Sequence, residues 1–146
     1  MNRFANANEE FDYILKEIKG LVDCAVSAKN ICVVARTHKL LDDYISQFTA
    51  KGIRCYEIKG NKADNRGLDG IRVATMHRVK GLEFQYIFIV AANKRIVPLA
   101  SAIDQTDSIS KMETMTAEKC LLYVALTRAQ KGAYVSGYGD LSEFLK

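Results

Sequence analysis

Hydrophobic and polar positions along the chain follow two different periods, one typical of helices and one typical of buried strands. Apolar residues recur at three-and-four spacing from Phe11 to Ala25 and again from Leu40 to Phe48. These two patterns predict amphipathic helices that each bury one face. We expect Asn8 to cap the first helix and Thr37 to cap the second, and we expect Gly52 to end the second.

Continuous apolar runs separate the helical patterns. Ile31 to Ala35 and Tyr86 to Ala91 lack polar positions, which predicts strands covered on both faces. Shorter strands are predicted at residues 53–58, 71–74 and 133–137. Strands that alternate with helices in this way predict an α/β domain with a mostly parallel sheet and helices on both faces.

The remaining segments are predicted from their polar residues and turn signals. Residues 59–70 are rich in glycine and charge and are predicted to form a surface loop. Residues 75–84 are predicted to form a turn and a short helix, and a last helix is predicted over about residues 117–129. Residues 93–116 are polar and contain the single proline, so we expect an irregular segment there.

Composition limits the classes of protein to be considered. The 146 residues suit one domain, and the net charge of +4 is compatible with a nucleic-acid partner without requiring one. The longest apolar run is too short to cross a bilayer, and no apolar leader is present at the start, so we expect a cytoplasmic protein without a membrane partner. The four cysteines form no C-x-x-C pair, which predicts reduced buried thiols and no metal site.

The positions of Arg36 and Arg128 can each be interpreted in two ways. Arg36 directly follows an apolar strand, where a guanidinium either faces a phosphate or forms a surface salt bridge. Arg128 falls on the flank of the buried stripe of the last predicted helix. It either reaches a partner surface or lies over its apolar neighbours.

The segment from Thr75 to Phe84 has an unusual combination of residues. Gly81 permits the backbone to approach a ligand closely. His77 and Lys80 can donate hydrogen bonds to phosphate oxygens, and Glu83 can accept them from sugar hydroxyls. The alternative is a simple turn whose apolar residues complete the core.

Two features of nucleotide hydrolases are absent from the sequence. No segment matches the phosphate-binding pattern G-x-x-x-x-G-K-[ST], and the run 86–91 is not followed by an Asp-Glu pair that could hold magnesium. We therefore expect the isolated chain to hydrolyse no ATP and to bind no cofactor by itself.

Three segments resemble the C-terminal motifs of UvrD/Rep-like superfamily 1 DNA helicases, and they follow one another along the chain in the same order as in that family. Residues 75–84 resemble the family's T-x-H-x-x-K-G-L-E-F motif. Residues 122–129 resemble its L-Y-V-A-L-T-R-A motif, and Glu118 matches an acidic residue that commonly precedes it. Residues 34–37 resemble its strand-ending R-T motif. The resemblance extends over residues 9–145 and implies that residues 1–146 form a single second RecA-like domain that lacks the phosphate-binding loop.

The resemblance implies a role for several of these residues at a shared nucleotide site. In the family, ATP binds between two RecA-like domains, and the first domain holds most of the contacts to ATP and Mg²⁺. Arg128 corresponds to the arginine finger, and Arg36 to a second contact to the γ-phosphate. Glu83 corresponds to the ribose contact, with Gly81 beside it.

The resemblance also implies a nucleic-acid partner. Thr75, His77 and Lys80 are expected to lie at single-stranded DNA, in preference to RNA. Two departures limit the resemblance. The family often has an adenine-stacking aromatic residue just before the motif arginine, where this chain has Ala35, and about forty residues separate Arg36 from Thr75, which leaves no room for the helical subdomain of larger members.

The expected function is therefore that of the C-terminal motor domain of an ATP-dependent DNA helicase or translocase, a hydrolase class that includes DNA repair enzymes. The domain would be part of a longer helicase and would work with its N-terminal RecA-like domain. A stand-alone, non-catalytic module that binds nucleic acid or a protein partner is the alternative. A third possibility is an unrelated nucleotide-binding α/β domain that carries the motifs by chance.

Overall fold

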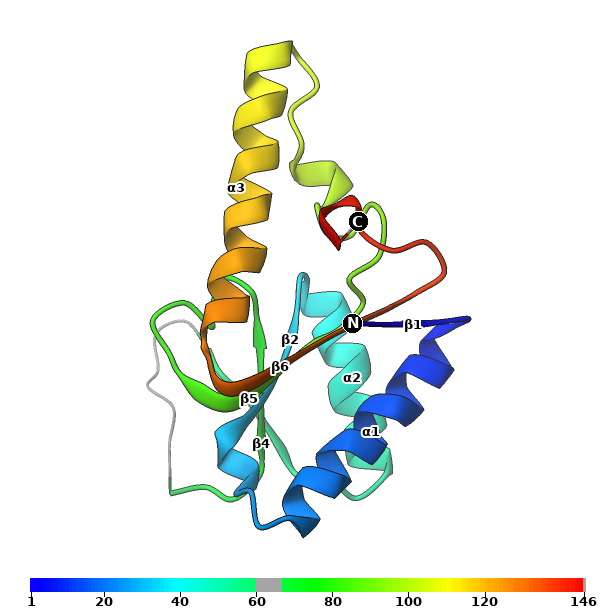
Figure 1. Cartoon of the computed structure of the whole chain (residues 1–146), viewed down its shortest axis with the longest axis vertical. Coiled ribbons are helices and arrows are strands. Elements are labelled where there is room, and N and C mark those ends of the chain that lie inside the picture. Colours follow the sequence, from blue (N-terminus) through cyan, green and yellow to red (C-terminus); the bar gives the residue numbers. More distant parts are fainter. Residues whose placement is uncertain (60–66, 146) are drawn as a thin grey trace.

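A six-stranded sheet forms the centre of the computed structural model, which describes residues 1–59 and 67–145 (Figure 1). The strands lie in the order β1-β6-β5-β2-β4-β3, and every neighbouring pair is parallel. Their bounds are β1 Asn2–Phe4, β2 Ile31–Ala35, β3 Cys55–Glu57, β4 Ile71–Thr75, β5 Phe84–Ile89 and β6 Ala129–Tyr138. This confirms the predicted α/β class and its parallel sheet.

Helices cover both faces of the sheet, as predicted. Alternate residues of β2 point to opposite faces, so Val33 and Ala35 join one core and Cys32 and Val34 join the other. Helices α1 and α2 pack on the first face, and α3 packs on the second. The helices are α1 Ala7–Asp23, α2 His38–Ala50 and α3 Ser108–Thr127, with short 3-10 turns η1 Ala28–Asn30, η2 Ala100–Ala102 and η3 Glu143–Leu145.

Helix α3 differs most from its prediction, because it begins at Ser108 rather than near residue 117. Figure 1 shows its first half projecting beyond the sheet, in yellow. Ile109 and Met112 are exposed there, so this half has no buried stripe and no helical period in its apolar residues. The Asp107 side chain caps this end of the helix by accepting a hydrogen bond from the Ser110 amide at 2.7 Å, a cap that was not predicted.

Smaller differences occur at the ends of elements. Asn6, not Asn8, caps α1, accepting a hydrogen bond from the Glu9 amide at 3.0 Å. Thr37 caps α2 as predicted. The segment 75–84 contains turns but no helix, β6 is longer than predicted, and β1 was not predicted, because three edge residues carry no periodic signal.

Three further predictions concerned a surface loop, the burial of the cysteines and the absence of a membrane-spanning segment. Residues 60–66 of the predicted loop lie outside the described residues. Cys24 and Cys120 are exposed, so the prediction of buried thiols holds for Cys32 and is wrong for these two. Within the ranges 1–59 and 67–145, no helix combines the length and the apolar character that crossing a bilayer requires.

Parallel pairing brings the ends of three strands to one edge of the sheet. Ala35 of β2 pairs with Thr75 of β4, and Val34 pairs with Ile89 of β5. The residues that follow these strands therefore emerge side by side. Ligands of open parallel sheets bind at this carboxyl edge.

Candidate functional site

A polar pocket of about 470 Å³ opens at the carboxyl edge, where the segments after β2 and β4 meet. Its lining consists of Arg36, Thr37, His38, Thr75, His77 and Arg78. Three of the residues predicted for the site are therefore brought together from two motifs that lie about forty residues apart in the sequence. Two arginines and two imidazoles around one opening favour an anionic ligand.

The first turn of α2 contributes to the same pocket. The helix begins at His38, and the Thr37 hydroxyl caps it by accepting a hydrogen bond from the Leu40 amide at 3.3 Å. The amino end of a helix of this length carries a partial positive charge. That charge adds to the guanidinium of Arg36 on the preceding residue and strengthens the preference for phosphate oxygens.

Arg36 is held in place by a carboxylate from the other side of the fold. Its Nε and Nη2 atoms donate to the two carboxylate oxygens of Glu118, at 2.9 and 2.8 Å. Both side chains are largely buried, with 10% and 6% of their surfaces exposed. Glu118 also accepts a hydrogen bond from the Leu99 amide at 2.8 Å. The pair is therefore a two-point clamp that fixes the direction of the guanidinium plane.

The clamp keeps Glu118 ionised. Burial acts to raise the pKa of Glu118, but hydrogen bonds from Arg36 and from the Leu99 amide outweigh burial and hold the pKa below its usual value. An ionised Glu118 beside an always-charged Arg36 leaves the pair neutral overall. The positive end of that pair faces the pocket that Arg36 lines.

His77 is exposed in part and lies close to this charge. Burial, and after it the positive charges of Arg36 and Arg78, lower the pKa of His77, while Glu118 acts in the opposite direction. At neutral pH the imidazole is therefore uncharged, so it offers one donor and one acceptor to a ligand. Its chemistry in the pocket is hydrogen bonding rather than charge.

Compact turns carry the chain from this pocket to β5. The carbonyl of Thr75, which is itself buried, accepts hydrogen bonds from the amides of Arg78 and Val79. Gly81 lies in the same turns at φ +83°, a conformation that side chains other than glycine rarely adopt. A Cβ at Gly81 would meet no atom within 4 Å, so its exposed backbone is open to a ligand. Lys80 is also exposed here and does not line the pocket.

Arg128 and Glu83 form a second group, where β5 and β6 begin. The Phe84 amide donates to the carbonyl of Arg128 at 3.0 Å, and the side chain of Gln130 donates to Glu83 at 3.1 Å. These contacts place the predicted finger beside the predicted ribose contact.

Arg128 is the residue that ends α3. Its Nη2 atom donates to the Thr127 hydroxyl at 3.3 Å. Its Nε atom is buried and has no hydrogen-bond partner among the described residues. A buried donor without a partner costs about 1–3 kcal/mol, so this conformation of Arg128 is held at some expense and a change of rotamer that exposes Nε would be favoured by a hydrogen-bond acceptor.

The two groups lie at different points along α3. Glu118, which holds Arg36, precedes Arg128 by ten residues, or about 15 Å of helix. No hydrogen bond joins the side chains of Arg36 and Arg128 in the described part of the chain.

Sequence reasoning missed parts of the pocket. Glu118 was noted as a motif match, but its contact with Arg36 was not expected, because the two residues lie 82 positions apart. Thr37 was predicted as a helix cap and as part of the R-T motif, and His38 had no role of its own. Ala35 is fully buried in the core beneath α1 and α2, so it offers no stacking surface to a base.

Comparisons with known proteins identify the family of the chain. The family described as the UvrD-like helicase C-terminal domain matches residues 57–139. The chain is 41% identical over 64 residues to the ATP-dependent DNA helicase Rep of Escherichia coli K12, covering 44% of this chain and 8% of Rep. It is 35% identical over 68 residues to the ATP-dependent DNA helicase PcrA of Staphylococcus aureus Mu50, covering 47% and 9%. The chain thus matches less than a tenth of the length of these relatives.

A solved structure shows the same fold. The C-terminal domain of a possible DNA helicase from Lactobacillus plantarum WCFS1 superposes with a TM-score of 0.70 at 17% identity, covering 98% of this chain and 75% of that one. The parallel sheet and its order of elements are consistent with the RecA-like fold expected from the motifs. The family match extends over more than half of the 146 residues and contains both longer motifs, residues 75–84 and 122–129, in full. The chain therefore belongs to the family of UvrD-like helicase C-terminal domains.

Proposed function

We propose that this domain is the second half of an ATP-driven DNA motor and supplies cationic groups to a nucleotide held mainly by another RecA-like domain. The observation that carries the proposal is the pocket at the carboxyl edge, where Arg36 is clamped by Glu118 and surrounded by further donors. A fixed guanidinium stabilises the charge that gathers on phosphoryl oxygens in the transition state.

Arg128 is proposed as the arginine finger. Its Nε atom lacks a partner among the described residues, and the carboxylate of Glu83 lies in the same group. The Nη2 atom makes one weak, exposed hydrogen bond to the Thr127 hydroxyl, so the guanidinium can turn toward an oxygen on a neighbouring domain at little cost. Such a finger, supplied across a cleft, contributes about 10³–10⁵ to the rate of hydrolysis in comparable motors.

Glu83 and Gly81 are proposed to contact the ribose. A carboxylate accepts hydrogen bonds from sugar hydroxyls. Gly81, whose positive φ favours glycine, has no side chain and leaves the backbone beside Glu83 open. The carboxylate of Glu83 is exposed, and its hydrogen bond from Gln130 leaves its other oxygen as an acceptor.

Thr75, His77 and Lys80 are proposed to contact single-stranded DNA. They lie on one continuous segment that begins at Thr75, the last residue of β4. This segment leads from the polar pocket around Arg36, called the phosphate pocket below, to the turn with Gly81. A DNA contact on the segment that lines the nucleotide pocket would couple movement along the strand to the state of the nucleotide.

The first RecA-like domain is proposed to hold Mg²⁺ and most contacts to ATP. The sequence of this chain contains no phosphate-binding loop. Its relatives Rep and PcrA are described as ATP-dependent DNA helicases, and this chain matches less than a tenth of their length. The complete motor would accordingly include this domain and a phosphate-loop domain that encloses the nucleotide with it.

The test measures ATP hydrolysis by a complete helicase that contains this domain, with Arg36→Ala, Arg36→Lys and a control, Arg54→Ala. Arg54 is exposed and lines the pockets at the opposite edge of the sheet. We expect Arg36→Ala to lower kcat by about 100-fold or more, because an interaction made with the transition state is lost. Arg36→Lys should recover little of this loss, since an ammonium cannot replace the two-point geometry.

Two outcomes would overturn the proposal. One is normal turnover in Arg36→Ala, and the other is ATP hydrolysis by the isolated 146-residue chain at the rate of the complete enzyme. If the isolated chain binds single-stranded DNA and no phosphate-loop domain stimulates hydrolysis, the stand-alone binding module is the correct description.

A further inference from the structure

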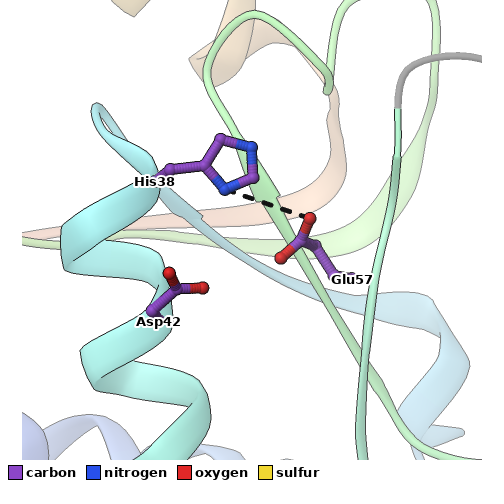
Figure 2. A group of neighbouring side chains, drawn as sticks. All are labelled: His38, Asp42 and Glu57. Carbon is purple, nitrogen blue, oxygen red and sulfur yellow. Dashed lines mark ion pairs between the residues drawn. The ribbon is translucent and has the colours of Figure 1, made fainter.

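A second cluster of chemically active side chains lies beside the phosphate pocket, and the proposed function uses none of its residues except His38, which lines the pocket. His38 and Asp42 lie one turn apart on α2, and Glu57 is on the edge strand β3 (Figure 2). Each offers one potential ligand atom, and these atoms all lie within 4.8 Å of one another. Figure 2 shows the carboxylates of Asp42 and Glu57 directed toward the imidazole from two different elements.

The charges in this cluster are not balanced. Two carboxylates converge, and the His38 Nδ1 atom lies 4.0 Å from the nearer oxygen of Glu57, which is too long for a hydrogen bond. Among the described residues, neither carboxylate forms an ion pair with a lysine or arginine. Glu57 is also mostly buried, with 16% of its side chain exposed, so its charge is poorly screened by water. A divalent cation would neutralise both carboxylates at once.

The geometry points to a metal site: we propose that His38, Asp42 and Glu57 bind a divalent transition-metal ion, with Zn²⁺ as the best fit. Two ligands at positions i and i+4 of a helix lie on one face and can hold the same ion. The third ligand comes from a neighbouring strand, which is the usual way a fold completes such a set. One imidazole and two carboxylates match Zn²⁺, with water in the fourth position.

The ligand atoms need only a small adjustment. Around a tetrahedral Zn²⁺ with bonds of about 2.1 Å, ligand atoms are separated by roughly 3.4 Å. The present separations of up to 4.8 Å exceed this by little more than an ångström. His38 and Asp42 are exposed and can rotate, whereas Glu57 is mostly buried on β3 and has less freedom to move.

The imidazole distinguishes this site from a magnesium site. Mg²⁺ prefers six oxygen ligands and keeps much of its water, so one nitrogen and two carboxylates are a poor set for it. The site is therefore separate from any Mg²⁺ that accompanies ATP. It nevertheless shares His38 with the phosphate pocket, so a bound metal would fix one wall of that pocket and add positive charge to it.

The test is calorimetric titration of ZnCl₂ into the full 146-residue chain and into Asp42→Asn, Glu57→Gln and His38→Gln. The matched control is Asp43→Asn, which removes a carboxylate from the adjacent position of α2 that is not part of the cluster. We expect one saturable site whose affinity falls by at least about tenfold in each of the three ligand variants, because loss of an outer-shell partner alone costs 10–100-fold. The control should bind as the parent does.

The exposed cysteines require a control experiment. Cys24 and Cys120 are both exposed and could bind zinc adventitiously, so the titrations are repeated in Cys24→Ser/Cys120→Ser. Cobalt(II) substitution then reports the ligands, since a site of nitrogen and oxygen lacks the sulfur-to-metal charge-transfer absorption of a thiolate site.

The proposal fails if the parent shows no saturable Zn²⁺ binding, if Asp42→Asn and Glu57→Gln bind as tightly as Asp43→Asn, or if binding disappears with the two cysteines. Thermal melts of each variant without metal identify loss of folding as a separate effect. Asp42→Asn is the safest variant in this respect, because its side chain is exposed on a helix surface. The Arg36 variants test the proposed function separately, since Arg36 and Glu118 take no part in the cluster, and Asp42→Asn and Glu57→Gln leave every residue that lines the pocket unchanged.

Discussion

Arg36 and Glu118 lie 82 residues apart in the sequence and form two parallel hydrogen bonds of 2.9 and 2.8 Å. Arg36 follows the central strand β2, and Glu118 lies in the middle of α3 on the second face of the sheet. The pair therefore joins the carboxyl edge of the sheet to the helix that ends at Arg128. Any displacement of α3 would be transmitted directly to the phosphate pocket.

We expect Glu118→Ala to destabilise the domain by about 3–5 kcal/mol, because removing one partner leaves the largely buried guanidinium of Arg36 without its counter-charge. Urea denaturation measures the change. The matched control is the double variant Arg36→Met/Glu118→Leu, in which both charges are removed. It should recover much of the lost stability while remaining inactive in the complete helicase. Equal destabilisation in both variants would show that packing at Glu118, not charge, is responsible.

The same pair predicts how stability changes in acid. Hydrogen bonds outweigh burial and hold the pKa of Glu118 below its usual value of 4.5 in the folded state. The unfolded chain therefore takes up a proton at Glu118 before the folded chain does, so this stabilisation is complete above about pH 4.5 and is lost as the pH falls through the lower folded pKa. Melting temperatures between pH 6 and pH 3 should fall less steeply for Glu118→Gln than for the parent. Parallel curves would contradict this prediction.

Arg128→Ala should lower kcat for ATP hydrolysis by about 10³-fold or more in the complete helicase, since a finger of this kind supplies 10³–10⁵. The fold should be intact, because the Arg128 side chain forms one weak hydrogen bond, to the adjacent Thr127. Removing its unpartnered buried Nε should cost little or even stabilise the isolated domain. Single-turnover ATPase kinetics and a thermal melt test the two parts. Turnover near the parent rate would refute the assignment of Arg128 as the finger.

His77→Ala should weaken the stimulation of ATP hydrolysis by single-stranded DNA by about fivefold, the equivalent of one hydrogen bond of about 1 kcal/mol. Burial and Arg36 lower the pKa of His77, so at neutral pH the contact is made by an uncharged imidazole. His77→Gln, which keeps a donor and an acceptor, should retain more stimulation than His77→Ala. The effect should be constant from pH 7 to pH 9. Unchanged stimulation in His77→Ala would count against the contact.

A buried carboxylate on the first face predicts the opposite pH dependence to Glu118. Glu10 is fully buried, accepts hydrogen bonds from the Tyr44 hydroxyl and from the Ala91 amide at 3.0 Å, and has its pKa raised by burial. The folded state therefore holds the proton of Glu10 more tightly than the unfolded state does, and stability is lost as the pH rises from about 4.5 through the raised pKa. Glu10→Gln should remove this loss.

Melting curves of the parent and Glu10→Gln from pH 4 to pH 8 check the prediction. The stability of the variant relative to the parent should increase with pH, and the neighbouring exposed variant Glu9→Gln should show no such trend. A constant difference between Glu10→Gln and the parent would show that ionisation of Glu10 does not contribute.

Periodicity predicted the elements that pack on the sheet, and it failed where elements leave the sheet. The run from Ile31 to Ala35 was predicted to the residue, because every position is buried and apolar. The first half of α3 was predicted as irregular, because Ile109 and Met112 face solvent and produce no stripe. The three-residue strand β1 gave no signal, since it pairs only at the edge of the sheet.

The amino-acid sequence by itself determined the α/β class, the order of its main elements and the three motifs with their order along the chain, because these depend on local spacing. Only the tertiary structure decided which motif residues meet: parallel pairing of β2 with β4 brings Arg36 and His77 to one pocket, and the packing of α3 places Glu118 against Arg36. The same packing leaves Arg128 in a separate group with Glu83. Contacts between residues far apart in the chain depend on how strands pair and helices pack, and no local pattern records that choice.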